Sequence, residues 1–328
     1  AESVKCSGSG GASDQLTCLR SLSVDDLLKS NLTTVPIIGS DAIAGSPATG
    51  SSLGDLAVRS FYEALAPGAT VQSAAAYHPE MAPIMPWAAV IDGVNLLEVP
   101  LESLKANKWA DVPVIFGTNK NEGTIFVPAL VVVVPGTKFP PTTANLEAAL
   151  PHFFSHYTSN TTAVADAVTN AMAMYPLSAH NNSQWRRAAA IMRDWFFTCA
   201  TRRAATAISD NGGDVWLYQF SQKLPWLMYD VLGDYHGSEV YLVFGYSDLT
   251  HPYNSDVTST SDAMMTYWTS MAYRGSPNTG LSSAPTYWPQ FNSTAEMNMQ
   301  LSWPLAANAN LETTVCDFWD KTLSSFQS

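Results

Sequence analysis

Two short apolar runs stand out from the more polar sequence around them. Val112-Pro-Val-Ile-Phe-Gly-Thr is compact, rich in β-branched and aromatic residues, and ends in a turn at Gly117. Val215-Trp-Leu-Tyr-Gln-Phe has the same character. Both runs predict short buried strands. Because chemistry often sits where such strands end, the residues that follow them are the first candidates for a functional site.

Longer stretches with helical periodicity separate and follow these strands. The patterns predict helices over residues 141–175, 183–209, 262–274 and 311–326. In the second stretch the spacing puts four residues near one helix face: Ile191, Trp195, Phe196 and Cys199. Strands separated by long helical stretches predict an α/β fold, in which helices flank a mainly parallel central sheet.

Residues 37–80 differ from the rest of the chain. They are rich in Ala, Gly and Ser, with one helical segment near residues 56–65, and we interpret them as an insertion into a single domain that spans residues 1–328. The most apolar stretch, Phe126 to Pro135, is about half as long as the roughly 20 residues that a helix needs to cross a bilayer. It predicts buried core, and no transmembrane segment is expected.

Composition and charge narrow the function classes. With 328 residues, 46% of them hydrophobic, the chain can bury a sizeable core. Its net charge of −12 repels phosphate backbones and anionic lipid headgroups, which excludes nucleic acid as an expected partner.

Cysteines and glycosylation signals point to a secreted glycoprotein. The four cysteines fit two disulfides, although four cysteines allow three pairings. Four Asn-X-Ser/Thr sites occur, at Asn31, Asn160, Asn181 and Asn292. The polar start of the chain has no apolar signal-peptide core, so we expect any targeting segment to have been removed or to lie upstream.

Several local sequences resemble one family. Residues 119–124, Asn-Lys-Asn-Glu-Gly-Thr, are similar to the loop that carries the acidic triad member in the type-B carboxylesterase, cholinesterase and fungal lipase family. Residues 235–245, Tyr-His-Gly-Ser-Glu-Val-Tyr-Leu-Val-Phe-Gly, resemble its histidine loop, and residues 267–278 and 287–289 resemble its later Trp-containing segments. The resemblance covers nearly all of the chain except residues 37–80.

The resemblance implies a fold, a disulfide pattern and two catalytic residues. The fold would be the C-terminal half of an α/β-hydrolase domain, and the disulfides would be Cys6–Cys18 and Cys199–Cys316. Glu122 and His236 would be the acid and the histidine of a Ser-Glu-His triad. In such a triad the imidazole takes the proton of a serine hydroxyl, and the carboxylate fixes the imidazole tautomer.

The family's nucleophile is the largest departure from the pattern. It lies in a Gly-Glu-Ser-Ala-Gly turn between a strand and a helix, and this chain has no such sequence. The literal Gly50-Ser-Ser52-Leu-Gly54 follows Ala-Gly-Ser-Pro-Ala-Thr, which cannot form a central strand, so we interpret Ser52 as a decoy. We therefore expect the serine and the oxyanion hole to come from a companion N-terminal chain.

Other candidate sites and functions are weighed against simpler interpretations. Trp226 and Met228, shortly before His236, could line an ester pocket, although an aromatic-rich loop also arises from ordinary packing. His152 and His156 have helical i, i+4 spacing but no Glu of a His-Glu-x-x-His motif, so neither a metal nor another cofactor is expected. His180 and His251 lie in loop-like sequence and are expected to be solvated. The alternative to an ester hydrolase is a non-catalytic, cholinesterase-like binding or adhesion protein.

Overall fold

The computed structural model describes residue 91 and residues 94–129, 141–155, 157–280 and 285–327. Several sequence predictions lie outside these residues. They concern the Cys6–Cys18 disulfide, the Asn31 glycosylation site, Ser52, the insertion over residues 37–80, residues 130–135 of the apolar stretch, and His156.

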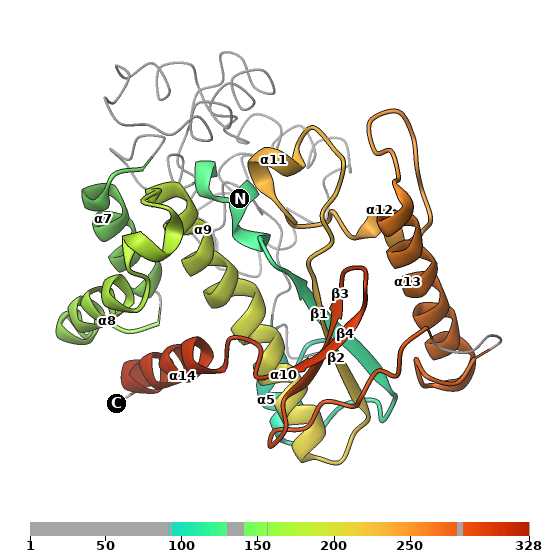
Figure 1. Ribbon diagram of the computed structural model, residues 1–328. Coiled ribbons are helices and arrows are strands. Elements are labelled where there is room, and N and C mark those ends of the chain that lie inside the picture. Colours follow the sequence, from blue (N-terminus) through green and yellow to red (C-terminus); the bar gives the residue numbers. More distant parts are fainter. Residues whose placement is uncertain (1–90, 92–93, 130–140, 156, 281–284, 328) are drawn as a thin grey trace, which may run out of the picture.

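A four-stranded sheet forms the centre of the described structure (Figure 1). Its strands are β1 (Val114–Asn119), β2 (Val215–Phe220), β3 (Met297–Leu301) and β4 (Ala306–Ala309), in the order β1-β2-β3-β4. The first three strands are parallel, and β4 is antiparallel to β3. The predicted mainly parallel sheet is therefore confirmed. The first strand begins at Val114 and not at Val112, because Pro113 has no N–H for the ladder.

Strand β2 is covered on both faces, which explains its nearly continuous apolar sequence. Trp216 and Phe220 pack on the side of helix α13 (Ser255–Arg274), in a cluster with Met264. Val215 and Leu217 point to the other side, where they pack in a cluster with residues of helix α10 (Cys199–Asp210). Alternate residues of a strand point to opposite faces, so one six-residue segment joins two hydrophobic clusters.

Helices surround the sheet. The remaining ones are α5 (Pro100–Lys105), α7 (Thr143–Phe154), α8 (Thr161–Met174), α9 (Gln184–Met192), α11 (Tyr229–Leu232), α12 (Val240–Val243) and α14 (Thr313–Gln327). Short 3-10 turns occur at η2 (Glu122–Ile125), η3 (Val127–Ala129) and η4 (Leu177–His180). The predicted helices are present, but two boundaries were wrong.

Side-chain caps explain those two boundaries. The stretch 141–175 forms two helices, because the side chain of Asn160 caps a new helix by accepting bonds from Thr162 N and Ala163 N. Helix α13 begins at Ser255, seven residues before the predicted start, since Asn254 caps it through Val257 N. Its end at Gly275, which adopts a left-handed conformation, agrees with the prediction.

One long helical segment runs beside the sheet, from the turn that follows β1 to the loop that leads into β2. Helix α9 continues through a π-helical turn, η5 (Arg193–Thr198), directly into α10. Figure 1 shows this helix crossing the molecule from the side of α7 toward α5. Near its start it packs on η2, where the backbone of Gly123 meets Ala189 so closely that a Cβ atom would lie 2.0 Å from the Ala189 carbonyl oxygen. Only glycine fits there.

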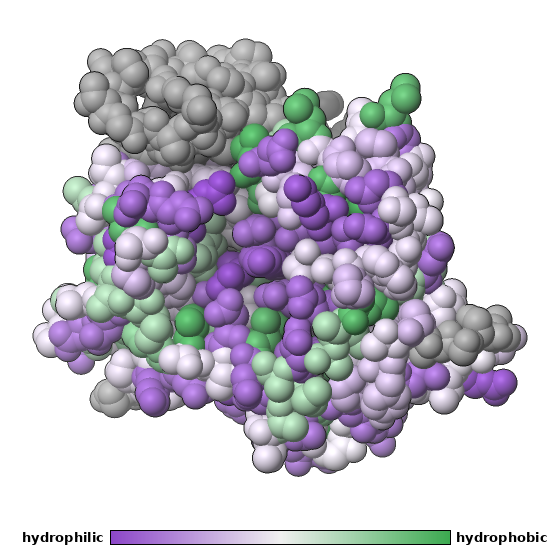
Figure 2. All heavy atoms as spheres, in the orientation of Figure 1, coloured by the Kyte–Doolittle hydropathy of each residue, from purple (hydrophilic) through white to green (hydrophobic). Residues whose placement is uncertain are grey.

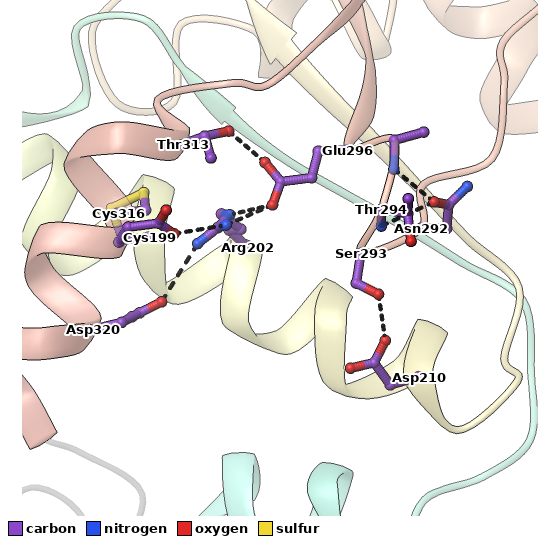
Figure 3. A network of polar contacts seen from close by, with 12 residues as sticks. Cys199, Arg202, Asp210, Asn292, Ser293, Thr294, Glu296, Thr313, Cys316 and Asp320 are labelled. Carbon is purple, nitrogen blue, oxygen red and sulfur yellow. Dashed lines mark hydrogen bonds and ion pairs between the residues drawn. A yellow bond between two sulfur atoms is a disulfide. The ribbon is translucent and has the colours of Figure 1, made fainter.

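The C-terminal helix is fastened to α10 in two ways (Figure 3). A disulfide joins Cys199 to Cys316, the pairing that the family resemblance implies. Beside it, the Arg202 guanidinium contacts Glu296 Oε1 at 2.5 Å and Asp320 Oδ2 at 3.4 Å. Covalent and ionic contacts together hold α14 against the body of the fold.

Candidate active site

Glu122 lies just beyond the carboxyl end of β1. It is the first residue of η2 and only 5% exposed. Its Oε1 atom accepts a 2.7 Å hydrogen bond from the backbone N–H of Asn119. The close contact of the next residue, Gly123, with α9 fixes this turn from the other side. The carboxylate is therefore held in one place by strand, turn and helix together.

His236 lies on the loop between α11 and α12. Its Nδ1 atom is 2.6 Å from Glu122 Oε2, while its side chain remains 48% exposed. The rings of Phe126 and Phe197 pack against the imidazole, with centroid distances of 5.2 and 4.9 Å. The carboxylate thus holds one edge of the imidazole, aromatic rings confine it, and it is half open to solvent.

The carboxylate sets the chemistry of this imidazole. The hydrogen bond to Glu122 raises the pKa of His236 above its usual value, and burial acts in the opposite direction. With Nδ1–H donating to the carboxylate, the neutral imidazole presents Nε2 as an acceptor. That atom can take a proton from a hydroxyl group and return it later.

The loops that carry the two residues are connected by further hydrogen bonds. Asn121 N donates to the Asp234 carbonyl, Asp234 N donates to Asn121 Oδ1, both at 3.1 Å, and Thr124 Oγ1 donates to the Leu232 carbonyl at 2.9 Å. The Asp234 side chain is buried, and its Oδ1 atom has no hydrogen-bond partner in the described part of the chain. Burial raises the pKa of Asp234 to about 7. The acid and histidine loops consequently form one unit.

Sequence comparison decides the family. The family model described as "Carboxylesterase family" matches residues 1–319. The chain belongs to this family. Carboxylesterases have the α/β-hydrolase fold, and the mixed sheet with flanking helices is part of it.

Relatives of this chain are much longer than the chain itself. Acetylcholinesterase 1 of Caenorhabditis briggsae is 26% identical over 67% of this chain and 38% of its own length. Secreted lipase 1 of Botryotinia fuckeliana (strain B05.10) and bile salt-activated lipase of Bos taurus are each 28% identical, over 72% of this chain and 40% of their own length. The chain therefore spans about 40% of the length of these relatives.

The two residues predicted to line a pocket lie in packing contacts. Trp226 is 4% exposed, donates from Nε1 to the Pro252 carbonyl at 3.1 Å, and packs edge-on against Tyr241 and His251. Met228 is partly buried against the cluster beneath helices α7 and α9. These contacts fit the ordinary packing that we weighed above, and a pocket role for either residue stays a prediction.

Two histidines expected to be solvated are partly buried, so that expectation was wrong. His251 stacks on Tyr241 with a ring distance of 4.0 Å, and its Nδ1 lies 3.0 Å from Asp248 Oδ1. His180 stacks on Tyr175 at 6.0 Å, and burial lowers its pKa. Loop-like sequence does not reveal that a histidine will stack on a nearby tyrosine ring.

The remaining sequence predictions concern glycosylation, metal binding and membrane spans. Asn160, Asn181 and Asn292 are all exposed, as glycosylation requires. In the described ranges no three His, Cys, Asp or Glu side chains gather in a way that could hold a metal ion. No helix among them is long and apolar enough to cross a membrane.

The sequence patterns did not single out several residues that surround Glu122 and His236. They are Asn119, Phe126, Phe197, Asp234 and Glu239. Asn119 and Glu239 belong to the same two local motifs as Glu122 and His236, which was the available signal.

A cavity of about 800 Å³ lies next to the acid and histidine loops, lined by residues such as Lys120, Arg193 and Lys223. Figure 2 shows hydrophilic side chains gathered in a hollow on this face.

Proposed function

We propose that this chain is part of a carboxylic-ester hydrolase, in which Glu122 is the acid and His236 the general base of a Ser-Glu-His triad. The observation that carries the proposal is the 2.6 Å hydrogen bond between Glu122 Oε2 and His236 Nδ1, in a chain that belongs to the carboxylesterase family. The half-exposed imidazole leaves its Nε2 side accessible for a serine hydroxyl.

The reaction follows from these positions. The serine oxygen attacks the ester carbonyl carbon while His236 Nε2 takes the hydroxyl proton. The tetrahedral intermediate then expels the alcohol, which leaves with the proton that His236 returns. Water attacks the resulting acyl-serine in the same way and releases the carboxylic acid. Throughout, Glu122 stabilises the positive imidazolium.

The serine and the oxyanion hole are proposed to lie on a companion N-terminal chain. No serine in the described ranges forms a hydrogen bond with His236. Within those ranges β1 is an edge strand, paired only with β2, and an unpaired strand edge readily binds another strand. Large apolar side chains on both sides of His236 in sequence, Leu227 and Phe244, are 89% and 78% exposed and suit a protein contact.

Secretion and modification belong to the same proposal. One relative is named secreted lipase 1, and the buried Cys199–Cys316 disulfide suits an oxidising compartment. We propose a secreted glycoprotein with a second disulfide, Cys6–Cys18, and glycans on the four sequons. Trp226 and Met228 are proposed to line the ester pocket.

A fluorophosphonate ester, which labels activated serines, tests the function. The native, unreduced protein is treated with the probe, and the labelled peptide is mapped by mass spectrometry; heat-denatured protein is the control. We expect a label on a Gly-x-Ser-x-Gly serine outside residues 1–328, and its absence in H236A. Separation under reducing conditions shows whether that serine lies on a separate chain. Folded protein without any label would instead support the non-catalytic binding protein.

A further inference from the structure

We infer that Asn119 is a positioning residue that fixes the acid and the histidine of this site at the same time. The catalytic consequence rests on the function proposed above, whereas the geometric role stands on the hydrogen bonds of the described residues. Its hydrogen bonds go to Glu122, Tyr235 and Glu239 and not to the imidazole of His236, so it acts through its neighbours.

Three hydrogen bonds leave this one residue. Its backbone N–H donates to Glu122 Oε1 at 2.7 Å. Its side-chain Nδ2 donates to the Tyr235 carbonyl at 2.9 Å and, in a short bond, to Glu239 Oε2. The residue is 1% exposed, so water does not compete for these bonds.

The two side-chain bonds enclose His236. Tyr235 directly precedes the histidine, and Glu239 follows it by three residues, at the start of α12. One amide group therefore holds the histidine loop on both sides of the imidazole. Gly237, with φ of +87°, lies between these two points, in a backbone conformation that glycine adopts at no steric cost.

The position of Asn119 makes it a rigid anchor. It is the last residue of β1 and pairs in register with Phe220 of β2, whose side chain is fully buried. The residue that ends the strand thus donates its backbone hydrogen bond to the acid and its side-chain hydrogen bonds to the histidine loop. A shift of the strand end moves both together, which preserves their mutual geometry.

The chemistry requires an asparagine here. Aspartate would place an oxygen against the Tyr235 carbonyl and the Glu239 carboxylate, both of which are acceptors. Burial raises the pKa of Glu239, while the bond from Asn119 lowers it. The buried Oδ1 atom of Asn119 has no partner in the described residues, so the amide is held by its two N–H donors. Without them, Glu239 is a partly buried carboxylate that lacks its side-chain donor.

The experiment compares N119A and N119D with N121A in the whole esterase, including its companion chain. Asn121 also joins the two loops, through Asp234 N, but donates to neither Glu122 nor Glu239. We expect kcat to fall about 10- to 100-fold in N119A and further in N119D, with KM within about twofold, because misplacement of catalytic groups by about 1 Å has effects of this size. N121A should lose less than about threefold.

A second readout does not depend on activity. Selective ¹⁵N labelling of histidine reports the Nδ1–H resonance of His236 and its titration by NMR. We expect N119A to broaden or lose the downfield proton that N121A retains. E239Q keeps an acceptor for Asn119, so it should retain this proton but lower the pKa of His236, since the negative charge of Glu239 raises it.

The two readouts separate the two ideas. Loss of the Nδ1–H signal in N119A, in a protein without esterase activity, supports the positioning role and removes the proposed function. An unchanged signal and unchanged kcat in folded N119A overturn the positioning role and leave the function intact. Equal losses in N119A and N121A show general loop tethering and also overturn it. If N119A does not fold, N119S, a shorter polar variant, takes its place in the same comparison.

Discussion

His236 Nδ1 and Glu122 Oε2 lie 2.6 Å apart although 114 residues separate them in the chain. The carboxyl end of β1 brings one residue, and the loop after α11 brings the other. Because the carboxylate is buried and the imidazole half exposed, the pair has a protected side and an open side. This asymmetry is what a general base needs: one nitrogen fixed by the fold, the other free for a substrate or nucleophile.

Replacing Glu122 by Gln should impair His236 as a general base while leaving the imidazole in the protein. The amide Nε2 of the new side chain donates to His236 Nδ1 and therefore favours the wrong imidazole tautomer. We expect kcat to fall about 10³- to 10⁴-fold, as when a triad carboxylate becomes an amide. The midpoint of the acid limb of the pH–rate profile should move to a lower pH than in the unmodified protein, because the bond to Glu122 raises the pKa of His236. A profile whose midpoint does not move would contradict this role of Glu122.

Phe197 and its neighbour Phe196 offer a matched test of confinement. The Phe197 ring lies 4.9 Å from the His236 ring, whereas Phe196 packs on Phe153 at 6.0 Å. Burial lowers the pKa of His236, so F197A should raise that pKa further and reduce kcat/KM at pH 7 by about tenfold as the imidazole loses its fixed position. F196A should leave the pKa of His236 unchanged by NMR titration. Equal shifts in both variants would show that the contact has no specific effect.

The placement of Phe197 shows where sequence reasoning ends. A helical period of 3.6 correctly groups Ile191, Trp195 and Cys199 as buried. The π-helical turn over Arg193–Thr198 has a different period, and it leaves Phe197 beside His236. Nothing in the local pattern indicates that turn, because a π turn depends on long-range packing.

Some strands and site residues can be predicted from the local sequence, whereas others depend on contacts that only the fold creates. The apolar, β-branched and aromatic sequences of β1 and β2 predict strands by themselves. Strands β3 and β4, Met-Asn-Met-Gln-Leu and Ala-Ala-Asn-Ala, have weak strand propensity and form because β3 pairs with β2. Likewise, local motifs point to Glu122 and His236, but the bond from Asn119 to Glu239 spans 120 residues and is visible only in the fold.

Removing the Cys199–Cys316 disulfide should destabilise the fold strongly. The two residues are 117 positions apart, and a loop of this length corresponds to about 4–5 kcal/mol in the chain-entropy model. We expect the C199S/C316S double variant to lose stability of this order in urea unfolding followed by fluorescence. Both cysteines are fully buried, so reductant should act on the native protein only slowly. Unfolding midpoints that agree within error would contradict the expected contribution.

Replacing Arg202 should cost more stability than replacing the adjacent Arg203. Arg202 is mostly buried and contacts Glu296 at 2.5 Å, Asp317 at 3.0 Å and Asp320 at 3.4 Å. R202M leaves the buried Glu296 carboxylate without its cation and should cost about 3–5 kcal/mol. Among the described residues Arg203 has one ion-pair partner, Asp320, which is 37% exposed, so R203M should cost about 1 kcal/mol or less. Urea unfolding measures both, and equal losses would show that burial of the ion pair is not decisive.

Asp234 should make the stability of the protein depend on pH near neutrality. Its pKa is raised from 3.8 to about 7, chiefly by burial, so the folded state keeps a proton that the unfolded state has already released. The contribution of this group to stability is therefore complete below about pH 4, falls as the pH rises toward 7, and stays low above that. In D234N the neutral amide should remove this dependence.

We expect the stability of D234N to match that of the unmodified protein at pH 4 and to exceed it at pH 8 by about 4 kcal/mol, from 1.36 kcal/mol per unit of pKa. The exposed Asp230, four residues earlier, provides the control, since D230N removes a surface charge without the burial. Urea unfolding at several pH values gives the three curves; parallel curves for D234N and the unmodified protein would mean that the Asp234 carboxylate finds a partner in the native protein.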